Sequence, residues 1–333
     1  MAKVPVIIHG GLVDLQVNGL VGVDFASPSL TLEDVRRASA ALYARGTIAF
    51  CATLVSSSLE VYRRNLPLLS EACELDLPAR VLGLHLEGPF ISQAEGARGA
   101  HSIEHLQKPD IALFDAWCEL ARGKVALVTL APELPGACEL IEHAKRAGAV
   151  VGIGHSMAGR SAISEAVAAG ARFATHLGNG IPSRISRHDN PLWPLLAEDR
   201  LSGLFITDGH HLPADFIQVA LRAKGAARFI VTSDATSPSG LQPGRYDALG
   251  QVVVLEANGR LHPEGSDYLA GSSASLLDCV NYLASLDLIA PEDIARVGRD
   301  NALELLGMDA RAAESELSIE YHEGQFVARG ASG

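Results

Sequence analysis

Residues 81–90 read VLGLHLEGPF, an apolar run that ends at a glutamate and enters a glycine turn. VVGIGHS (150–156) and FATHLGN (173–179) show the same pattern, in which an apolar run ends at a histidine. A carboxylate and two imidazoles suit a catalytic divalent metal with an open position for water. Spacings of 68 and then 21 residues are too wide for a zinc finger, so distant strand ends must meet. The three candidate ligands are Glu87, His155 and His176.

Outward from these runs, short apolar stretches alternate with amphipathic helical stretches. The predicted strands are 12–17, 47–53, 81–86, 124–130, 150–154, 172–176, 201–207 and 228–233. The predicted helices are 32–45 (capped by Thr31 with Asp34 at its third position), 59–73, 110–122, 135–147, 159–169, 192–198, 213–224, 273–285 and 291–306. Eight such alternations predict an α/β fold, a (β/α)8 TIM barrel. The alternative is an open doubly wound sheet.

The pattern changes in two places outside the alternation. Residues 235–270 are rich in Gly and Pro turns around the apolar run 251–256, which predicts a hairpin-like excursion. The tail 316–329 alternates like a hairpin. We therefore expect residues 11–307 to form the barrel, and the terminal segments 1–10 and 308–333 to form a reduced accessory β-sheet.

Composition narrows the class of protein. The chain has 333 residues, 48% of them hydrophobic and 20% charged, which is ordinary for an α/β enzyme. A formal net charge of −12 argues against a nucleic-acid partner. Five scattered cysteines without a CxxC pair favour a reducing compartment. The sequence has no signal-peptide core and no run of eighteen apolar residues, so we expect a cytoplasmic protein without a membrane partner.

In a barrel of this kind, active sites lie at the carboxyl ends of the strands. Polar residues end six of the eight predicted strands, among them Asp234 after the eighth. For a single strand-end histidine, the alternative is a structural role in hydrogen bonding. His85 projects to the same strand face as Glu87, and we expect it to be a buried neighbour of the ligands.

Six motifs in collinear order resemble those of the N-acetylglucosamine-6-phosphate deacetylases, in the amidohydrolase superfamily. They are HLEGPF (85–90), GHS (154–156), THLGNG (175–180), TDGHH (207–211), VTSDA (231–235) and LAGSSASL (269–276). The resemblance covers residues 11–307. It implies that Glu87, His155 and His176 hold the metal. It also implies that Asp234, as general base and then acid, serves a metal-activated water that splits the N-acetyl group from an amino-sugar 6-phosphate.

The resemblance also implies a ligand set and a partner. Many amidohydrolases hold a second metal with a His-x-His pair, and this chain has Gln16 and Asn18 at those positions. We therefore expect one metal ion, with Zn²⁺ as the first choice and Fe²⁺ as the alternative. A homodimer is implied, with residues near Arg187 and His211 crossing its interface. Arg184 and His210 are alternatives for these two. The implied substrate-binding residues are Ala100, His101, Asn179, Gly180, Arg187, His211, Leu269, Ala270 and Gly271.

The chain departs from the family pattern in its short termini and at Gly178 and Gly180, where a bulky residue and alanine are usual. Both glycines are expected to leave room beside the sugar. Two alternatives therefore stay open. One is a deacetylase of a different N-acyl amino sugar or another amide. The other is a non-catalytic barrel that binds a sugar phosphate.

Overall fold

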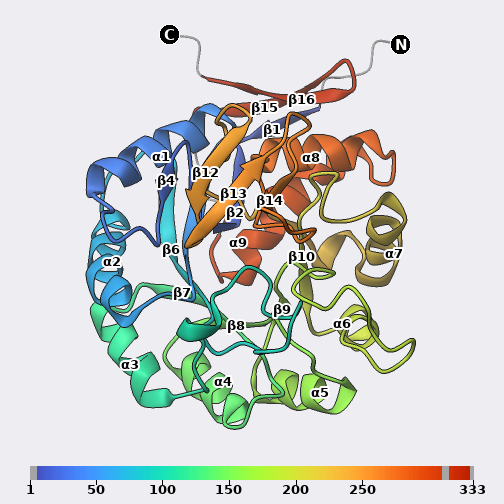
Figure 1. Cartoon of the computed structure of the whole chain (residues 1–333). Helices are drawn as coiled ribbons and strands as arrows, with labels where there is room; N and C mark the ends of the chain where they lie inside the picture. The colour runs from blue at the N-terminus through green and yellow to red at the C-terminus, as the bar shows by residue number, and fades with distance from the viewer. Residues whose placement is uncertain (1–5, 310–314, 331–333) are drawn as a thin grey trace.

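The computed structural model describes residues 6–309 and 315–330, and its centre is a ring of eight parallel strands (Figure 1). The strand order follows the chain without a reversal, so the predicted TIM barrel is confirmed and the doubly wound sheet is wrong. The barrel strands are β2 (Leu12–Val17), β5 (Thr47–Val55), β6 (Arg80–Glu87), β7 (Val125–Leu130), β8 (Val150–Ile153), β9 (Phe173–Ala174), β10 (Ser202–Phe205) and β11 (Phe229–Val231).

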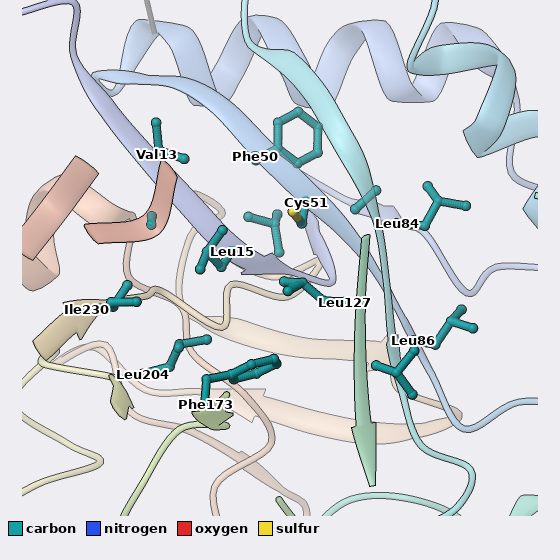
Figure 2. Close-up of a cluster of buried hydrophobic side chains, with 14 of the residues drawn as sticks. Val13, Leu15, Phe50, Cys51, Leu84, Leu86, Leu127, Phe173, Leu204 and Ile230 are labelled. Carbon is teal, nitrogen blue, oxygen red and sulfur yellow. The ribbon is translucent and has the colours of Figure 1, made fainter. Parts of the chain in front are cut away.

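Helices surround the strands, as Figure 1 shows. They are α1 (Leu32–Ala44), α2 (Leu59–Ala72), α3 (Ile111–Leu120), α4 (Ala137–Arg146), α5 (Arg160–Ala169), α6 (Leu192–Ala197), α7 (Ala214–Lys224), α8 (Leu276–Ser285) and α9 (Asn301–Leu305). Helix α1 begins as predicted, because Thr31 and Asp34 form a reciprocal capping box. Apolar side chains of the strands form the buried core, inside the barrel and between the strands and the helices (Figure 2). Gly152 makes room there for Phe173, whose ring a Cβ at position 152 would meet at 2.3 Å.

The barrel closes between its first and last strands through a side chain. Backbone contact is confined to the ends of these strands, where Asn18 N donates to Ala235 O at 2.7 Å. Below that point the buried Asp14 carboxylate accepts hydrogen bonds from the Thr232 hydroxyl at 2.7 Å and from the Ser233 hydroxyl. Burial raises the pKa of Asp14, and these hydrogen bonds oppose that shift. Asp14 therefore replaces a strand ladder at the seam.

Several predicted elements differ from the structure, among them β10 and β11, which are each three residues shorter than predicted. Strand β9 is shorter than predicted, because His176 adopts a left-handed backbone with φ 28° and ends the extended run. The predicted helix 291–306 is divided into a 3₁₀ turn (Pro291–Asp293), a π-helical turn (Arg296–Asp300) and α9. The π-helical turn packs on β2, where a Cβ at Gly298 would lie 3.0 Å from Leu12 Cδ2.

Smaller sheets lie outside the barrel. The predicted excursion is three-stranded, with β12 (Gly244–Ala248), β13 (Gln251–Leu255) and β14 (Leu261–Pro263). An accessory sheet joins β1 (Ile7–His9) to β15 (Ser318–His322) and β16 (Gln325–Arg329), at the top of the view in Figure 1. A short hairpin, β3 (Gly19–Leu20) with β4 (Val23–Asp24), follows β2 and was not predicted. Within the described part of the chain, no helix is long and apolar enough to cross a membrane.

Candidate metal centre and active site

Three potential ligand atoms converge at the carboxyl ends of β6, β8 and β9. Glu87 Oε1 lies 3.2 Å from His155 Nε2 and 2.9 Å from His176 Nε2. The two imidazole nitrogens are 3.0 Å apart. All three side chains are buried. The barrel thus brings together residues that are distant in sequence.

The protonation pattern of this cluster fits a cation. His155 Nδ1 donates to the Ala97 carbonyl at 2.8 Å, so Nε2 of the neutral ring carries a lone pair. That lone pair faces Glu87 Oε1, which is also an acceptor. His176 Nδ1 is buried without a hydrogen-bond partner among the described residues. A divalent ion between these atoms would turn a cluster of acceptors into a coordination shell.

Left-handed backbone aims several of these side chains. His155 has φ 50°, His176 has φ 28° and Asp234 has φ 51°, a region that residues other than glycine rarely adopt. Such strain persists where the surrounding structure holds it, and it clusters at functional sites. Here each turn follows a short buried strand and directs its side chain to the mouth of the barrel.

Asp234 and the two amides of β2 complete the centre. Asn18 Nδ2 donates to Asp234 Oδ1 at 2.7 Å, and Gln16 Nε2 donates to Glu87 Oε1 at 2.7 Å. Both amides therefore orient carboxylates. Burial, followed by the negative charge of Glu87, raises the pKa of Asp234 to about 8. A carboxyl group with such a pKa can accept and release a proton near neutral pH.

A pocket of about 940 Å³ opens over this centre. Most of the predicted substrate-binding residues line it: Ala100, His101, Asn179, Gly180, His211, Leu269 and Gly271. Ala270 is buried behind it in a small apolar cluster with β12–β14. Arg187 and Arg184 are exposed on the loop after β9 and do not line the pocket of their own chain. No lysine or arginine lines this pocket within the described ranges.

The structure distinguishes the two adjacent histidines after β10. His211 lines the pocket, and its Nδ1 donates to Asp208 Oδ2 at 2.7 Å. His210 is exposed and contacts the Asn258 carbonyl at 3.1 Å through Nε2. Burial alone would raise the pKa of Asp208, but the hydrogen bond and charge of His211 hold that pKa below its usual range. Ser272 also donates to Asp208, at 3.0 Å.

Two further histidines near the centre are buried and uncharged. Burial lowers the pKa of His85 to about 4 and that of His101 to about 3. His85 Nε2 lies 2.7 Å from the Thr129 hydroxyl, which in turn lies 2.7 Å from that of Thr175, the neighbour of His176. His101 Nδ1 lies 2.8 Å from the Ser56 hydroxyl. His85 supports the strands below the ligands, whereas His101 borders the pocket.

The two unusual glycines contact neighbours closely. A Cβ at Gly178 would lie 2.6 Å from Leu212 Cδ2, so the direction of a side chain there is already filled. A Cβ at Gly180, where φ is 62°, would lie 3.0 Å from His155 Nδ1. The expectation that both glycines leave free space beside the sugar is therefore wrong for these directions.

Some functional contacts were missed from the sequence. Asp208 lies three residues before His211 in a TDGHH turn, a spacing that could have indicated its role. Ser56, Thr129 and the Ala97 carbonyl carry no such signal, because only the fold brings them to the histidines.

The fold and the site define a (β/α)8-barrel hydrolase of the amidohydrolase type with a candidate metal centre. No protein-family model matches the sequence. The chain is 36% identical to N-acetylglucosamine-6-phosphate deacetylase of Bos taurus over 318 residues, covering 92% of this chain and 76% of that protein. It is 31% identical to the Bacillus subtilis enzyme of the same name, covering 90% and 75%.

The comparison with solved structures points to the same family of deacetylases. N-acetyl-D-glucosamine-6-phosphate deacetylase from Mycobacterium smegmatis, in complex with N-acetyl-D-glucosamine-6-phosphate, matches with a TM-score of 0.88 and 26% identity. That match covers 98% of this chain and 86% of the other. The Thermotoga maritima deacetylase matches with a TM-score of 0.84 and 25% identity, covering 98% and 87%. The chain belongs to the N-acetylglucosamine-6-phosphate deacetylase family.

Proposed function

We propose that the chain hydrolyses N-acetylglucosamine-6-phosphate to glucosamine-6-phosphate and acetate. The observation that carries the proposal is the convergence of Glu87, His155 and His176 with Asp234 in one pocket. Family membership supplies the reaction, and the geometry supplies the residues.

Glu87, His155 and His176 would hold one divalent ion, for which zinc suits the nitrogen and oxygen donors and Fe²⁺ is the alternative. When bound, such an ion polarises the amide carbonyl and lowers the pKa of a water molecule. Gln16 and Asn18 use their amide NH2 groups on carboxylates. Their amide oxygens are buried without a hydrogen-bond partner among the described residues, but an amide oxygen binds a transition metal more weakly than an imidazole does, so the arrangement favours a single ion.

Asp234 would act as general base and then as general acid. Its Oδ1 is held by Asn18 Nδ2, and no other side chain in the described part of the chain hydrogen-bonds to the carboxylate. The carboxylate would take the proton of the attacking water and give it to the leaving nitrogen when the carbon–nitrogen bond breaks. Gly271 lies close beside Asp234, since a Cβ there, where φ is 63°, would lie 2.4 Å from Thr236 Cγ2 and 3.0 Å from the Asp234 carbonyl oxygen.

The phosphate would need a cation that the pocket of a single chain does not offer. Arg187 is exposed, and none of the arginines in the described part of the chain lines the pocket. We propose a homodimer in which Arg187 of one subunit reaches the phosphate in the pocket of the other, beside His211. The five free thiols suit the reducing cytoplasm, where we place the enzyme.

The pocket lining contains no lysine or arginine among the described residues, which favours a second candidate, a deacetylase of an unphosphorylated N-acyl amino sugar. The pocket is bordered by carboxylates such as Asp24, Asp247 and Asp267, which would repel an anionic substrate.

Rates of hydrolysis of N-acetylglucosamine-6-phosphate and of N-acetylglucosamine, with metal content measured on the same protein, separate the two candidates. The main proposal expects a kcat/KM at least about a hundredfold higher for the phosphorylated sugar. Equal values would favour the second candidate.

A further inference from the structure

A second pocket, of about 530 Å³, lies on the barrel face opposite the metal centre. Its wall is formed where parallel strands begin: Val150 starts β8, Arg172 precedes β9, Ser202 starts β10 and Arg228 precedes β11. Helix α9 borders it through Asn301, Glu304 and Leu305. In barrel enzymes this face contributes to stability and not to the reaction, so the pocket is independent of the active site.

Its charge is opposite to that of the whole chain. Lys145, Arg172, Arg200 and Arg228 line it, and Glu304 is the one carboxylate among its described lining residues. The whole sequence has a formal net charge of −12. A concentration of cations in a concave site of an acidic protein raises the local concentration of anions.

Two of the cations are partly neutralised and two are not. Arg200 Nε pairs with Glu198 at 2.7 Å, and Arg228 pairs with Asp199 at 3.0 Å. Lys145 and Arg172 have no carboxylate partner in the described residues. Arg228 Nε is buried without an acceptor.

Each of the two cations without a carboxylate partner, Lys145 and Arg172, makes a local contact with the backbone. The Lys145 stem lies against Gly170 at the end of α5, where a Cβ would be 2.7 Å from Lys145 Cδ. Arg172 is tethered by a hydrogen bond from Nη1 to the Ala171 carbonyl at 3.0 Å. Both residues are exposed, so their charged groups remain accessible to an anion in the pocket.

We propose that this pocket, formed by Lys145, Arg172, Arg200 and Arg228, binds the phosphate group of a small phosphorylated metabolite. Arginine forks bind phosphate oxygens in a bidentate manner, and a lysine adds a point charge. The volume lies within the range of small-molecule sites. Binding here would make the enzyme's stability, and through it the amount of active enzyme, sensitive to a phosphorylated compound.

The test is calorimetric titration of the metal-loaded protein with glucose 6-phosphate, which has no amide to hydrolyse, and separately with inorganic phosphate. The double variant Lys145→Gln/Arg172→Gln should raise the dissociation constant of glucose 6-phosphate for this second pocket at least about tenfold. Arg222→Gln, which removes an exposed charge of α7 outside the pocket, should leave binding unchanged. Deacetylation without added phosphate should stay the same in both variants.

Glu304→Gln provides a test of opposite sign, which a loss of folding cannot mimic. Removal of this carboxylate should lower the dissociation constant by about threefold. The proposal would be overturned if binding were unchanged in both the double variant and Glu304→Gln. Binding would then be lost only in His211→Gln, which alters the active site. Binding of glucose 6-phosphate without binding of inorganic phosphate would support it and show that the sugar also contributes.

Discussion

At the scale of single residues, the site depends on side chains at strand ends whose backbone is left-handed. His155, His176 and Asp234 share this conformation, and each is followed within four residues by a turn glycine or a small residue. The strain they carry must be offset by the surrounding barrel. Substitutions that keep side-chain shape are therefore the cleanest probes of their chemistry.

Asp234→Asn removes the proposed base but keeps the size of the side chain. We expect kcat to fall by about 10²–10⁴-fold, since an amide cannot take up the proton of water. Metal content, measured by mass spectrometry of the purified protein, should be unchanged. Asp76→Asn, an exposed carboxylate that does not line the pocket, serves as the control and should keep nearly full activity. Full activity of Asp234→Asn would show that another group transfers the proton.

His176→Ala removes one of the three proposed ligands. Bound metal should fall from about one ion per chain to less than about a tenth of that at the same free concentration, because two donors hold a catalytic ion poorly. His188→Ala changes an exposed histidine of the following loop and should keep its metal. If His176→Ala retained a full complement of metal, the proposed ligand set would be incorrect.

At the scale of elements, the contact between β2 and β11 is the feature that the strand pattern did not reveal. The Asp14 side chain spans the seam to Thr232 and Ser233, directly before Asp234. The same strand β2 presents Gln16 and Asn18 to the site. Asp14 thus couples closure of the barrel to the position of the proposed catalytic groups.

Asp14→Ala should lower the free energy of unfolding by about 2–4 kcal/mol, because the buried donors of Thr232 and Ser233, directly after β11, lose their acceptor. Urea denaturation gives this value. Asp110→Ala, which removes only the cap of α3, should cost about 1 kcal/mol by comparison. An equal, small loss in both variants would mean that water replaces the carboxylate at the seam.

The order and type of the barrel elements, and some of their boundaries, followed from the sequence because apolar runs and capping residues act locally. Strand β2 has the predicted bounds, and the capping box of α1 was read from Thr31 and Asp34. The last helical segment was not predicted correctly, because its π-helical turn depends on how Gly298 packs against Leu12. Packing with a distant strand leaves no trace in local periodicity.

At the scale of the whole molecule, the pocket is deficient in positive charge for a phosphorylated substrate. Either a second subunit supplies the charge, or the substrate lacks the phosphate. The location of Arg187 on an exposed loop makes the first explanation testable with the intact protein.

Arg187→Gln should raise KM for N-acetylglucosamine-6-phosphate at least about tenfold and leave the weaker hydrolysis of N-acetylglucosamine unchanged. If the arginine acts across the interface, mixing this variant with His155→Ala should recover about a quarter of wild-type activity after subunit exchange. Each mixed dimer then has one complete site. A mixture no more active than its two components would exclude action of Arg187 between subunits.

The sequence by itself determined the barrel, the three metal-ligand candidates and Asp234, because strand ends and their polar residues are local patterns. It also indicated, through Gln16 and Asn18, that one ion would suffice. Only the tertiary structure decided that these amides orient Glu87 and Asp234, that Asp14 closes the seam, and that His211 and not His210 faces the pocket. It also separated the cations from the active site and placed four of them at the opposite face. These features depend on distances between residues far apart in the chain, which only the packed barrel fixes.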